Sequence, residues 1–409
     1  MKRIILILVL FLSAVYAYPQ SRTLRLDYCF SGNCSEAHIA LDEMRVLDGW
    51  AGRRSHMKDI PLKGNGQIML RSHEGDTLYR LSFSTLFQEW QNTEEATRLR
   101  RSFQNVFLLP MPDKQSEVTV ELYDSRGRIT ASLTHAVDPA DILIRPACGR
   151  AECRDIYIGG SSDRCIDVAI VAEGYTASES DLFHKDAFET VRAIFSHEPF
   201  RSMKERFNFR AVMLESAQSG VSVPGGGDWK DTPLHSSFDT FYSSRYLTTL
   251  HLKDLHDALA GVPYEHIIIL ANTSTYGGGG IYNSYALTAA HHQQFRPVVV
   301  HEFGHSFAGL ADEYYYDDQY SNYYFPDIEP WEPNITTMFD FGSKWEDMLG
   351  RQGVSLHEGG GYMSKGVWRG CGDCRMKTNS AREFCPVCRR AIERMIRFYT
   401  DPDSENKPD

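Results

Sequence analysis

The N-terminal third of the chain alternates between apolar and polar positions over short segments that Gly, Asp and Asn interrupt. The clearest of these segments are residues 23–28, 66–70, 78–83 and 117–123. A period of two places one face of a strand in a core and the other in solvent, which is typical of half-buried β-strands. Strands of this length and spacing predict a small β-sandwich. Residues 86–107 break the pattern, and we expect a helix or an extended loop there.

The second half of the chain changes to longer elements. Residues 165–172 form a nearly continuous apolar run, as in a strand covered on both faces, and a helix capped by Thr176 or Ser178 is expected to follow. Further strands are expected at 207–214 and 266–271. This order of elements, a strand followed by a helix, predicts an α+β or α/β domain with a mixed sheet. The glycine run 277–280 lacks the spacing of a nucleotide-binding loop, so we interpret it as a flexible turn near an edge strand.

The first residues have the features of an export signal. Lys2 and Arg3 precede an apolar run over residues 4–15, and small residues lead to Ala17, after which we expect cleavage. Pro139 and Pro146 frame the end of the strand-rich part. The expected organisation is therefore a signal peptide at 1–17, an N-terminal β-sandwich accessory domain at 18–150 and a catalytic domain at 151–409.

Composition and charge narrow the class of protein. The chain has 409 residues, of which 42% are hydrophobic and 24% charged, as in soluble globular proteins. Its formal net charge of −11 argues against a nucleic-acid or anionic-membrane partner. Apart from the signal, no stretch reaches the roughly 18 apolar residues of a membrane helix. We expect an exported protein that is secreted, periplasmic or attached to the cell surface. The sequence does not determine its oligomeric state.

The candidate catalytic segment is His301-Glu302-Phe303-Gly304-His305, an H-E-x-x-H motif that follows an apolar run. On a helix, His301 and His305 lie four residues apart on one face, so both imidazoles can bind one Zn²⁺. Glu302 lies beside that face, where it can act as general base toward water that the metal has acidified. The motif therefore predicts a zinc hydrolase.

A third metal ligand should follow the helix. Gly309 stands where a sharp helix exit is needed, and two acidic residues, Asp312 and Glu313, come shortly after it. Both offer hard oxygen donors. We predict Asp312 as the third ligand and keep Glu313 as its rival.

These residues also carry a resemblance to a known family. The segment from His301 through Gly309-Leu310-Ala311-Asp312-Glu313-Tyr314 resembles the bacterial IgA-peptidase family of metallopeptidases (metallopeptidase family 64). Residues 167–177, 283–286 and 384–388 look like further pieces of the same family, and the resemblance extends over residues 156–398. It implies a β-sandwich followed by a metzincin-like zinc peptidase domain. The implied activity is an endopeptidase acting on proteins or peptides.

A metzincin-like site also implies a methionine in a tight turn beneath the metal. Met376, in Cys374-Arg375-Met376-Lys377, fits that turn better than Met363. The chain departs from the usual metzincin spacing, because Gly309 and the following acid each come one residue late. No tyrosine follows Met376, so the sequence assigns no oxyanion donor. Two alternatives remain open: a non-catalytic binding protein on the same scaffold, and a zinc hydrolase of a non-peptide amide.

Nine cysteines are present, and their pairing cannot be deduced from spacing. Cys29 with Cys34 and Cys148 with Cys153 are close enough in sequence to close small loops. Two C-x-x-C units near the C-terminus, Cys371 to Cys374 and Cys385 to Cys388, have the spacing of a structural zinc site. Behind an export signal we favour disulfides that hold the Met376 turn against a C-terminal helix over residues 387–399.

A cluster of tyrosines and acids follows the zinc helix at residues 314–324. Asp317 and Asp318 offer oxygen ligands for Ca²⁺, and the tyrosines are an aromatic rim for substrate in that interpretation. The alternative is a solvated loop that its own tyrosines pack.

Overall fold

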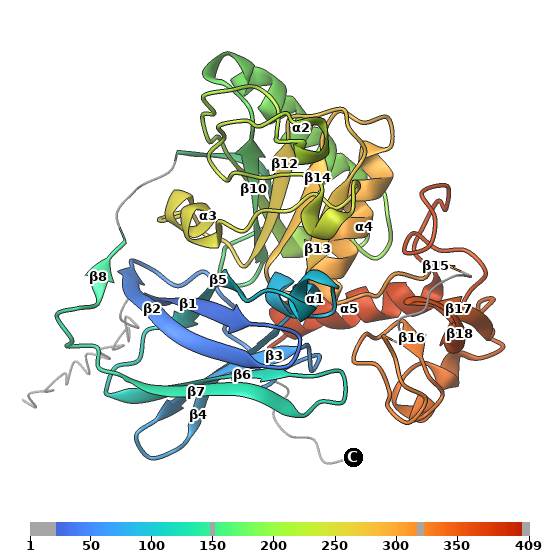
Figure 1. The fold of residues 1–409 in the computed structure, drawn as a ribbon, viewed down its shortest axis with the longest axis horizontal. Helices are drawn as coiled ribbons and strands as arrows, with labels where there is room; N and C mark the ends of the chain where they lie inside the picture. The colour runs from blue at the N-terminus through green and yellow to red at the C-terminus, as the bar shows by residue number, and fades with distance from the viewer. Residues whose placement is uncertain (1–21, 148–151, 317–322, 403–409) are drawn as a thin grey trace, which may run out of the picture.

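The computed structural model describes residues 22–147, 152–316 and 323–402. In these residues the chain is a mixed α+β protein with several sheets, few helices and an N-terminal domain of strands (Figure 1). The described part contains no helix that is long and apolar enough to cross a membrane. The predicted signal peptide lies outside the described residues.

The N-terminal strands form two four-stranded sheets. The first sheet, in spatial order, contains β5 (Arg101–Pro110), β1 (Thr23–Gly32), β2 (Ala37–Leu47) and β8 (Arg145–Pro146). The second contains β4 (Thr77–Phe83), β3 (Gly66–Ser72), β6 (Ser116–Tyr123) and β7 (Ile129–Val137). The predicted alternation is present in these strands. In β6, Val118, Val120 and Leu122 are fully buried, whereas Glu117 is exposed and Glu121 is half-buried; Thr119, between them, is also buried. Apolar residues from both sheets share one core.

The prediction for residues 86–107 was only partly right. A short helix, α1 (Leu86–Gln91), is present, but β5 begins at Arg101 and pairs antiparallel with β1. The buried positions of β5 do alternate, at Phe103, Asn105, Phe107 and Leu109. A polar residue at one buried position hid this pattern in the sequence.

The second part of the chain is built on a six-stranded sheet. Its strands, in spatial order, are β13 (Gly278–Ile281), β14 (Tyr285–Ala289), β12 (His266–Ala271), β10 (Ile166–Glu173), β11 (Phe207–Val212) and β9 (Cys153–Ile158). The four inner strands are parallel, whereas β13 and β9 run antiparallel at the two edges. The predicted mixed sheet is therefore present.

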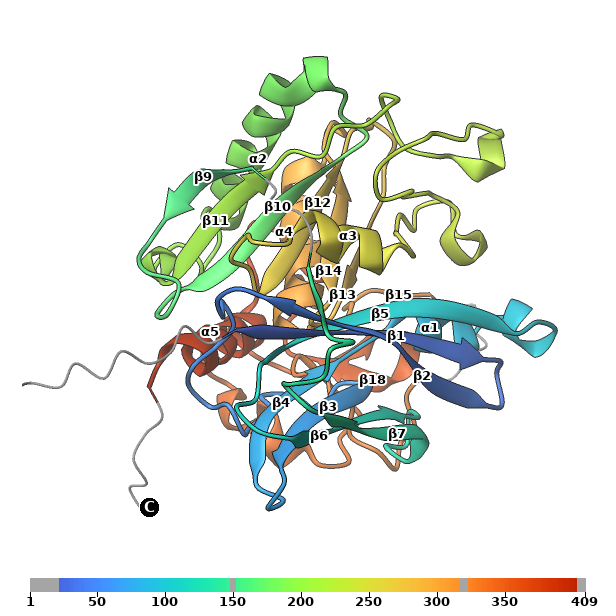
Figure 2. The ribbon, with the colours of Figure 1, turned by 90° about the vertical axis from the view of Figure 1, so that its left-hand side faces the viewer.

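Both faces of the six-stranded sheet are covered, as the apolar run in β10 predicts. Ile166, Val168 and Ile170 enter the core that the helices cover, whereas Ala169 and Val171 enter the core shared with the N-terminal strands. The helices on the first of these faces are α2 (Ser180–Ile194), α4 (Phe295–Ala308) and α5 (Pro386–Thr400), whereas α3 (Leu252–Ala258) contributes Leu252 and Leu255 to the core shared with the N-terminal strands. Figures 1 and 2 show α5 at the level between the six-stranded sheet and the N-terminal sheets.

The glycine run is an edge strand rather than a flexible turn. Residues Gly278–Ile281 form β13, which pairs with β14 and packs against α4. The space beside it is too small for side chains, because a Cβ on Gly280 would lie 2.4 Å from the backbone oxygen of Glu302. Glycine is therefore needed here because the backbone of β13 approaches that of α4 closely, and not because the segment is flexible.

The remaining elements are short. A small sheet after α4 contains β15 (Tyr315–Tyr316), β16 (Ile335–Thr336), β17 (His357–Gly360) and β18 (Tyr362–Arg369). The 3-10 turns are Glu95–Thr97, Ala177–Glu179, Lys204–Arg206, Pro224–Gly226, Thr240–Tyr242, Phe341–Ser343 and Glu346–Met348. The second of these turns begins with a capping box between Thr176 and Glu179, one of the two predicted caps.

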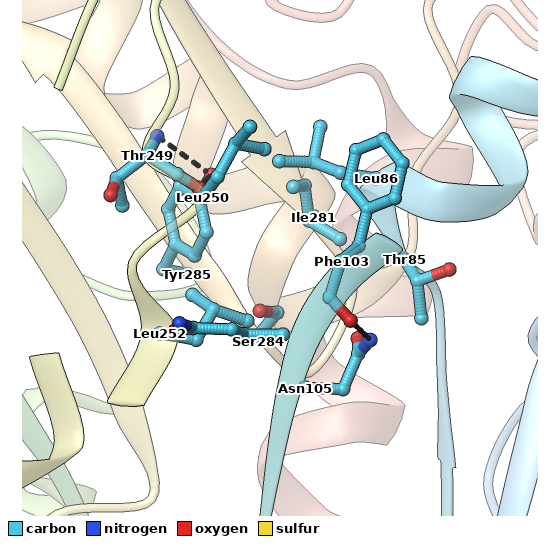
Figure 3. Close-up of a pocket in the computed structure, with 11 residues that line it drawn as sticks. Thr85, Leu86, Phe103, Asn105, Thr249, Leu250, Leu252, Ile281, Ser284 and Tyr285 are labelled. Carbon is cyan, nitrogen blue, oxygen red and sulfur yellow. Dashed lines mark hydrogen bonds between the residues drawn. The ribbon is translucent and has the colours of Figure 1, made fainter. Parts of the chain in front are cut away.

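The N-terminal strands and the six-stranded sheet meet at a small pocket (Figure 3). Leu86 and Phe103 line it from the N-terminal part, and Ile281 and Tyr285 line it from the sheet. The hydroxyl of Tyr285 accepts a hydrogen bond from the Thr249 N–H at 3.1 Å and donates one to the Thr249 carbonyl at 2.9 Å. The N-terminal strands thus lie directly against the six-stranded sheet.

Candidate metal centre and active site

The helix α4 carries the H-E-x-x-H motif, as the sequence predicts. Val299, Val300 and Phe303 bury its inner face. The helix ends at Gly309, whose φ of 59° is left-handed and whose N–H bonds back to the His305 carbonyl. A glycine adopts this conformation without strain, so the chain turns sharply and brings residues 310–313 back toward the histidines.

The two histidines point the same ring atom at each other. Nδ1 of His301 lies 3.0 Å from the Arg375 carbonyl oxygen, and Nδ1 of His305 lies 2.5 Å from the Leu310 carbonyl oxygen. Because a carbonyl only accepts, the neutral form of each ring carries its proton on Nδ1 and has its lone pair on Nε2. The two Nε2 atoms are 2.9 Å apart.

The carboxylate of Asp312 lies against the two histidines, whereas that of Glu313 points elsewhere. Oδ1 of Asp312 lies 2.9 Å from Nε2 of His301 and 3.3 Å from Nε2 of His305. Its other oxygen accepts a hydrogen bond from the Tyr362 hydroxyl at 2.5 Å. Glu313 points instead into a buried group of cysteines. The geometry therefore favours the predicted third ligand, Asp312, over its rival.

Three acceptor atoms converge here, which suits a metal ion. Ligands that hold Zn²⁺ tetrahedrally at 2.0–2.1 Å are about 3.3 Å apart, close to the separations of the two Nε2 atoms and Oδ1. The histidine side chains are 13% and 16% exposed, so the group is enclosed but reachable from solvent. The residues present fit zinc in donor type, number and spacing.

The pKa shifts of the histidines and Asp312 also indicate a site that binds a cation. Burial alone would lower the pKa of His305, but the carboxylates of Asp312 and Glu302 outweigh it and raise that pKa to about 9. Burial would likewise raise the pKa of Asp312, yet His305 and His301 hold it well below its usual range. The group therefore attracts positive charge, either as protons or as a metal ion, and the two compete.

Glu302 lies beside the histidines and against the backbone of β13. A Cβ on Gly278 would lie 2.8 Å from its Oε1, so the glycine leaves room for this carboxylate. Burial raises the pKa of Glu302, whereas His301 and His305 lower it and Asp312 raises it, with a net upward shift. A carboxylate with a raised pKa is a better proton acceptor, as general-base work requires.

The N-terminal part carries a carboxylate, Glu89, that feels the charges of this site, which the sequence did not reveal. Burial raises the pKa of Glu89, on α1, to about 7, with the hydrogen bond from Tyr246 and the charge of His305 opposing the rise. The charges of Asp312 and Glu302 raise it further. A charged residue on a short helix in a strand-rich region carries no sequence signal that would connect it to a distant motif.

Met376 lies beneath the metal group, and Met363 does not. Met376 is fully buried, and a Cβ on Gly304 would lie 2.9 Å from its sulfur. The Lys377 N–H bonds to the Cys374 carbonyl at 2.8 Å, so Met376 is a central residue of a tight turn. Met363 belongs to β18. The predicted preference for Met376 agrees with these positions.

The tyrosines after the helix gather around Tyr362, a residue that the sequence reading missed. The rings of Tyr314, Tyr316 and Tyr323 have centroids 5.4, 6.4 and 5.7 Å from that of Tyr362. Since Tyr362 bonds Asp312, this packing fixes the orientation of that carboxylate. The proposed Ca²⁺ ligands Asp317 and Asp318 lie outside the described residues.

The described cysteines form no disulfide, contrary to our expectation. The two sulfurs of Cys374 and Cys388 are 3.7 Å apart, whereas a disulfide requires about 2.05 Å. Cys29 and Cys34 are also unbridged, and Cys148 lies outside the described residues. The two C-terminal C-x-x-C units do lie together between the Met376 turn and α5, as predicted. Their cysteines are free thiols and not disulfides.

Comparison with known families agrees with the geometry. Residues 156–357 match the family described as IgA Peptidase M64, and residues 15–134 match the family described as Peptidase M64 N-terminus. A comparison with curated proteins gives no match. Together the two families account for most of the chain, from the N-terminal strands through the H-E-x-x-H helix and the acids that follow it. The chain thus belongs to the M64 family and is a peptidase.

Proposed function

We propose that the protein is an exported, zinc-dependent endopeptidase that cleaves peptide bonds in proteins. His301, His305 and Asp312 hold the zinc ion, and Glu302 is the general base. The observation that carries the proposal is the convergence of three acceptor atoms, two Nε2 and one Oδ1, within 3.3 Å of one another beside Glu302.

The residues of the site divide the work of hydrolysis. Zinc, when bound, supplies Lewis acidity that polarises the substrate carbonyl and acidifies water. Glu302 takes a proton from the attacking water and returns it to the leaving nitrogen. The carbonyls of Arg375 and Leu310 keep the histidine protons on Nδ1, so that both Nε2 atoms stay available as ligands. Tyr362 holds Asp312 in its ligating orientation.

The remaining sequence expectations belong to the same proposal. The N-terminal strands, with their two sheets around a shared core, are proposed as a β-sandwich accessory domain over residues 18–150, ahead of a metzincin-like domain over 151–409. Residues 1–17 are proposed as a signal peptide that directs export. Glu89, which approaches the site from the N-terminal part, supports a role for that domain in forming the substrate-binding surface.

The proposal is tested by separating metal binding from catalysis. Glu302→Gln should retain about one zinc at the site and the fold, and should lose about 10²–10⁴-fold in kcat, because the base is removed while the ligands remain. His301→Ala should lose both the zinc and the activity. The measurements are zinc content by mass spectrometry and cleavage of a peptide library with and without a chelator.

Glu117→Gln is the matched control, since Glu117 is an exposed glutamate on β6 in the N-terminal sheet. It should keep both zinc and activity. Full activity in Glu302→Gln would exclude Glu302 as the base. A zinc content equal to that of the wild type in His301→Ala and also in Asp312→Ala would exclude the ligand set.

A further inference from the structure

A second group of ligand-type side chains lies directly behind the first, and it plays no part in the proposed hydrolysis. It consists of Glu313, Cys374, Cys385 and Cys388, all of them buried. One potential ligand atom from each lies within 4.8 Å of every other. We call these four residues the thiol–glutamate cluster.

The carboxylate in this cluster lacks the partners that a buried charge requires. Glu313 is fully buried, its Oε2 accepts no hydrogen bond, and no Lys or Arg forms an ion pair with it among the described residues. Oε1 has one conventional donor, Nδ2 of Asn334 at 3.1 Å. Buried carboxylates are normally paired with a cation or coordinate a metal, because an isolated charge is costly to desolvate. The cluster thus has a place for a cation.

The spacing of the donor atoms fits a tetrahedral metal ion. Zn²⁺ with Zn–S distances of about 2.3 Å holds its sulfurs about 3.8 Å apart. Sγ of Cys374 and Sγ of Cys388 are 3.7 Å apart, and Oε1 of Glu313 lies 3.1 Å from Sγ of Cys388 and 4.0 Å from Sγ of Cys385. The Cys385 N–H also donates to Sγ of Cys374 at 3.2 Å, as expected for a sulfur that acts as an acceptor.

The remaining cysteine of the two C-x-x-C units, Cys371, lies at the edge of the compact group. Its thiol interacts with that of Cys385, but it is not among the four residues whose ligand atoms all lie within 4.8 Å of one another. Cys371 is only partly buried, and its sulfur lies 3.9 Å from the Gly353 carbonyl. Its place in a four-donor set is taken by Glu313, which the backbone brings in from the other side: the Glu313 N–H bonds to the Met376 carbonyl at 2.8 Å.

We propose that the thiol–glutamate cluster binds a second, structural zinc ion, with three thiolates and one carboxylate as ligands. This ion joins three segments that are distant in sequence: the loop that carries Asp312, the Met376 turn and the first turn of α5. It thereby fixes, from behind, two elements that position the histidine group. The proposal does not depend on the catalytic zinc or on hydrolysis.

The first test counts zinc in a protein that lacks the catalytic site. Wild-type protein should contain two zinc ions per chain, and the His301→Ala/His305→Ala double variant should contain one. Replacing that remaining ion with Co²⁺ should produce thiolate-to-cobalt charge-transfer absorption. A double variant without bound metal, or a cobalt spectrum without thiolate bands, would overturn the proposal.

The second test identifies the donors. Glu313→Gln and Cys388→Ser should each weaken binding of the second zinc by at least about tenfold, as loss of a ligand or its support does. Cys29→Ser, which removes a thiol on β1 away from the cluster, is the matched control and should retain it. Loss of the ion in Cys371→Ser together with its retention in Glu313→Gln would show that the donor set is wrong.

A third test uses the wild-type protein, so its outcome does not depend on whether the variants fold. Wild-type protein is denatured with a chelator but without reductant, and its cysteines are then alkylated and mapped by mass spectrometry. The proposal expects Cys374, Cys385 and Cys388 to be alkylated. Disulfide-linked peptides containing these residues would overturn it, whatever the outcome of the activity assays.

Discussion

His266 is a buried histidine whose surroundings exclude a charge. Its side chain is 3% exposed on β12, and its ring packs edge-on against Phe307 and Tyr399 at centroid distances of 4.9 and 5.1 Å. Its Nε2 has no hydrogen-bond partner among the described residues. Burial therefore lowers the pKa of His266 to about 3, and the folded protein holds this ring neutral.

This depressed pKa makes stability depend on pH. Below the ordinary value of 6.5 the unfolded chain binds a proton at His266 that the folded chain rejects, so the free energy of unfolding falls as pH drops from 6.5 to about 3. At pH 5 the loss from this residue is about 2 kcal/mol. His266→Phe keeps a ring and removes the titration, so its Tm should fall less than that of the wild type between pH 7 and pH 5.

Thermal unfolding of chelator-treated protein measures this difference without a contribution from zinc release. His73→Phe serves as the control, because His73 is an exposed histidine in the turn between β3 and β4 and should leave the pH dependence unchanged. Identical pH profiles for wild type and His266→Phe would contradict the assignment.

At the scale of elements, the contact between β13 and α4 sets the position of the active-site helix. A Cβ on Gly280 would lie 2.4 Å from the Glu302 carbonyl oxygen and 2.8 Å from Cβ of His305. Backbone atoms cannot rotate out of the way, so the strand and the helix must separate. We expect Gly280→Ala to reduce stability by about 1–3 kcal/mol and to weaken zinc binding, because His305 moves with the helix.

Denaturant unfolding and a competitive zinc titration measure the two effects of Gly280→Ala. Gly226→Ala is the control, since a Cβ there would meet only Cγ1 of Val223 at 3.8 Å, an ordinary contact. If Gly280→Ala binds zinc as tightly as the control, the position of α4 does not depend on this contact.

At the scale of the whole molecule, a buried arginine connects the N-terminal strands to the second part of the chain. Arg25, fully buried on β1, forms a fork with Asp27 at 2.7 and 2.9 Å. It also donates to Asp257 on α3 at 2.5 Å and to the Lys253 carbonyl at 3.2 Å. Arg45, on β2, donates to the same Asp257 oxygen at 2.8 Å.

Removing Asp257 should loosen this junction. Asp257→Ala deletes one acceptor of two guanidinium groups, while Asp27 still compensates Arg25, so we expect a loss of about 1–2 kcal/mol rather than the larger cost of an unpaired buried charge. The readouts are Tm and the rate of limited proteolysis between the two parts. Asp254→Ala, an exposed position on the same helix, should change neither. Equal behaviour of the two variants would exclude the Arg25 junction as a stabilising contact.

Some features of this protein depend only on residues that are neighbours in the chain, and these were predictable. The alternation in β6, the apolar runs of β10 and β12, and the H-E-x-x-H motif of α4 each correspond to an element at the predicted place. The helical exit at Gly309 likewise follows from the conformational freedom of one residue. Local patterns predict such features because burial and backbone propensity act over a few residues.

Other features depend on residues far apart in the chain, and these became apparent only from the fold. Spacing could not choose between Asp312 and Glu313, and the choice follows from the turn that aims one carboxylate at the histidines and the next at three cysteines. Tyr362 bonds Asp312 from a distant segment, Glu89 on another segment feels the charges of the site, and the glycines of β13 are needed because a helix packs against them. Such roles arise from packing between elements, which the local periodicity of the sequence does not predict.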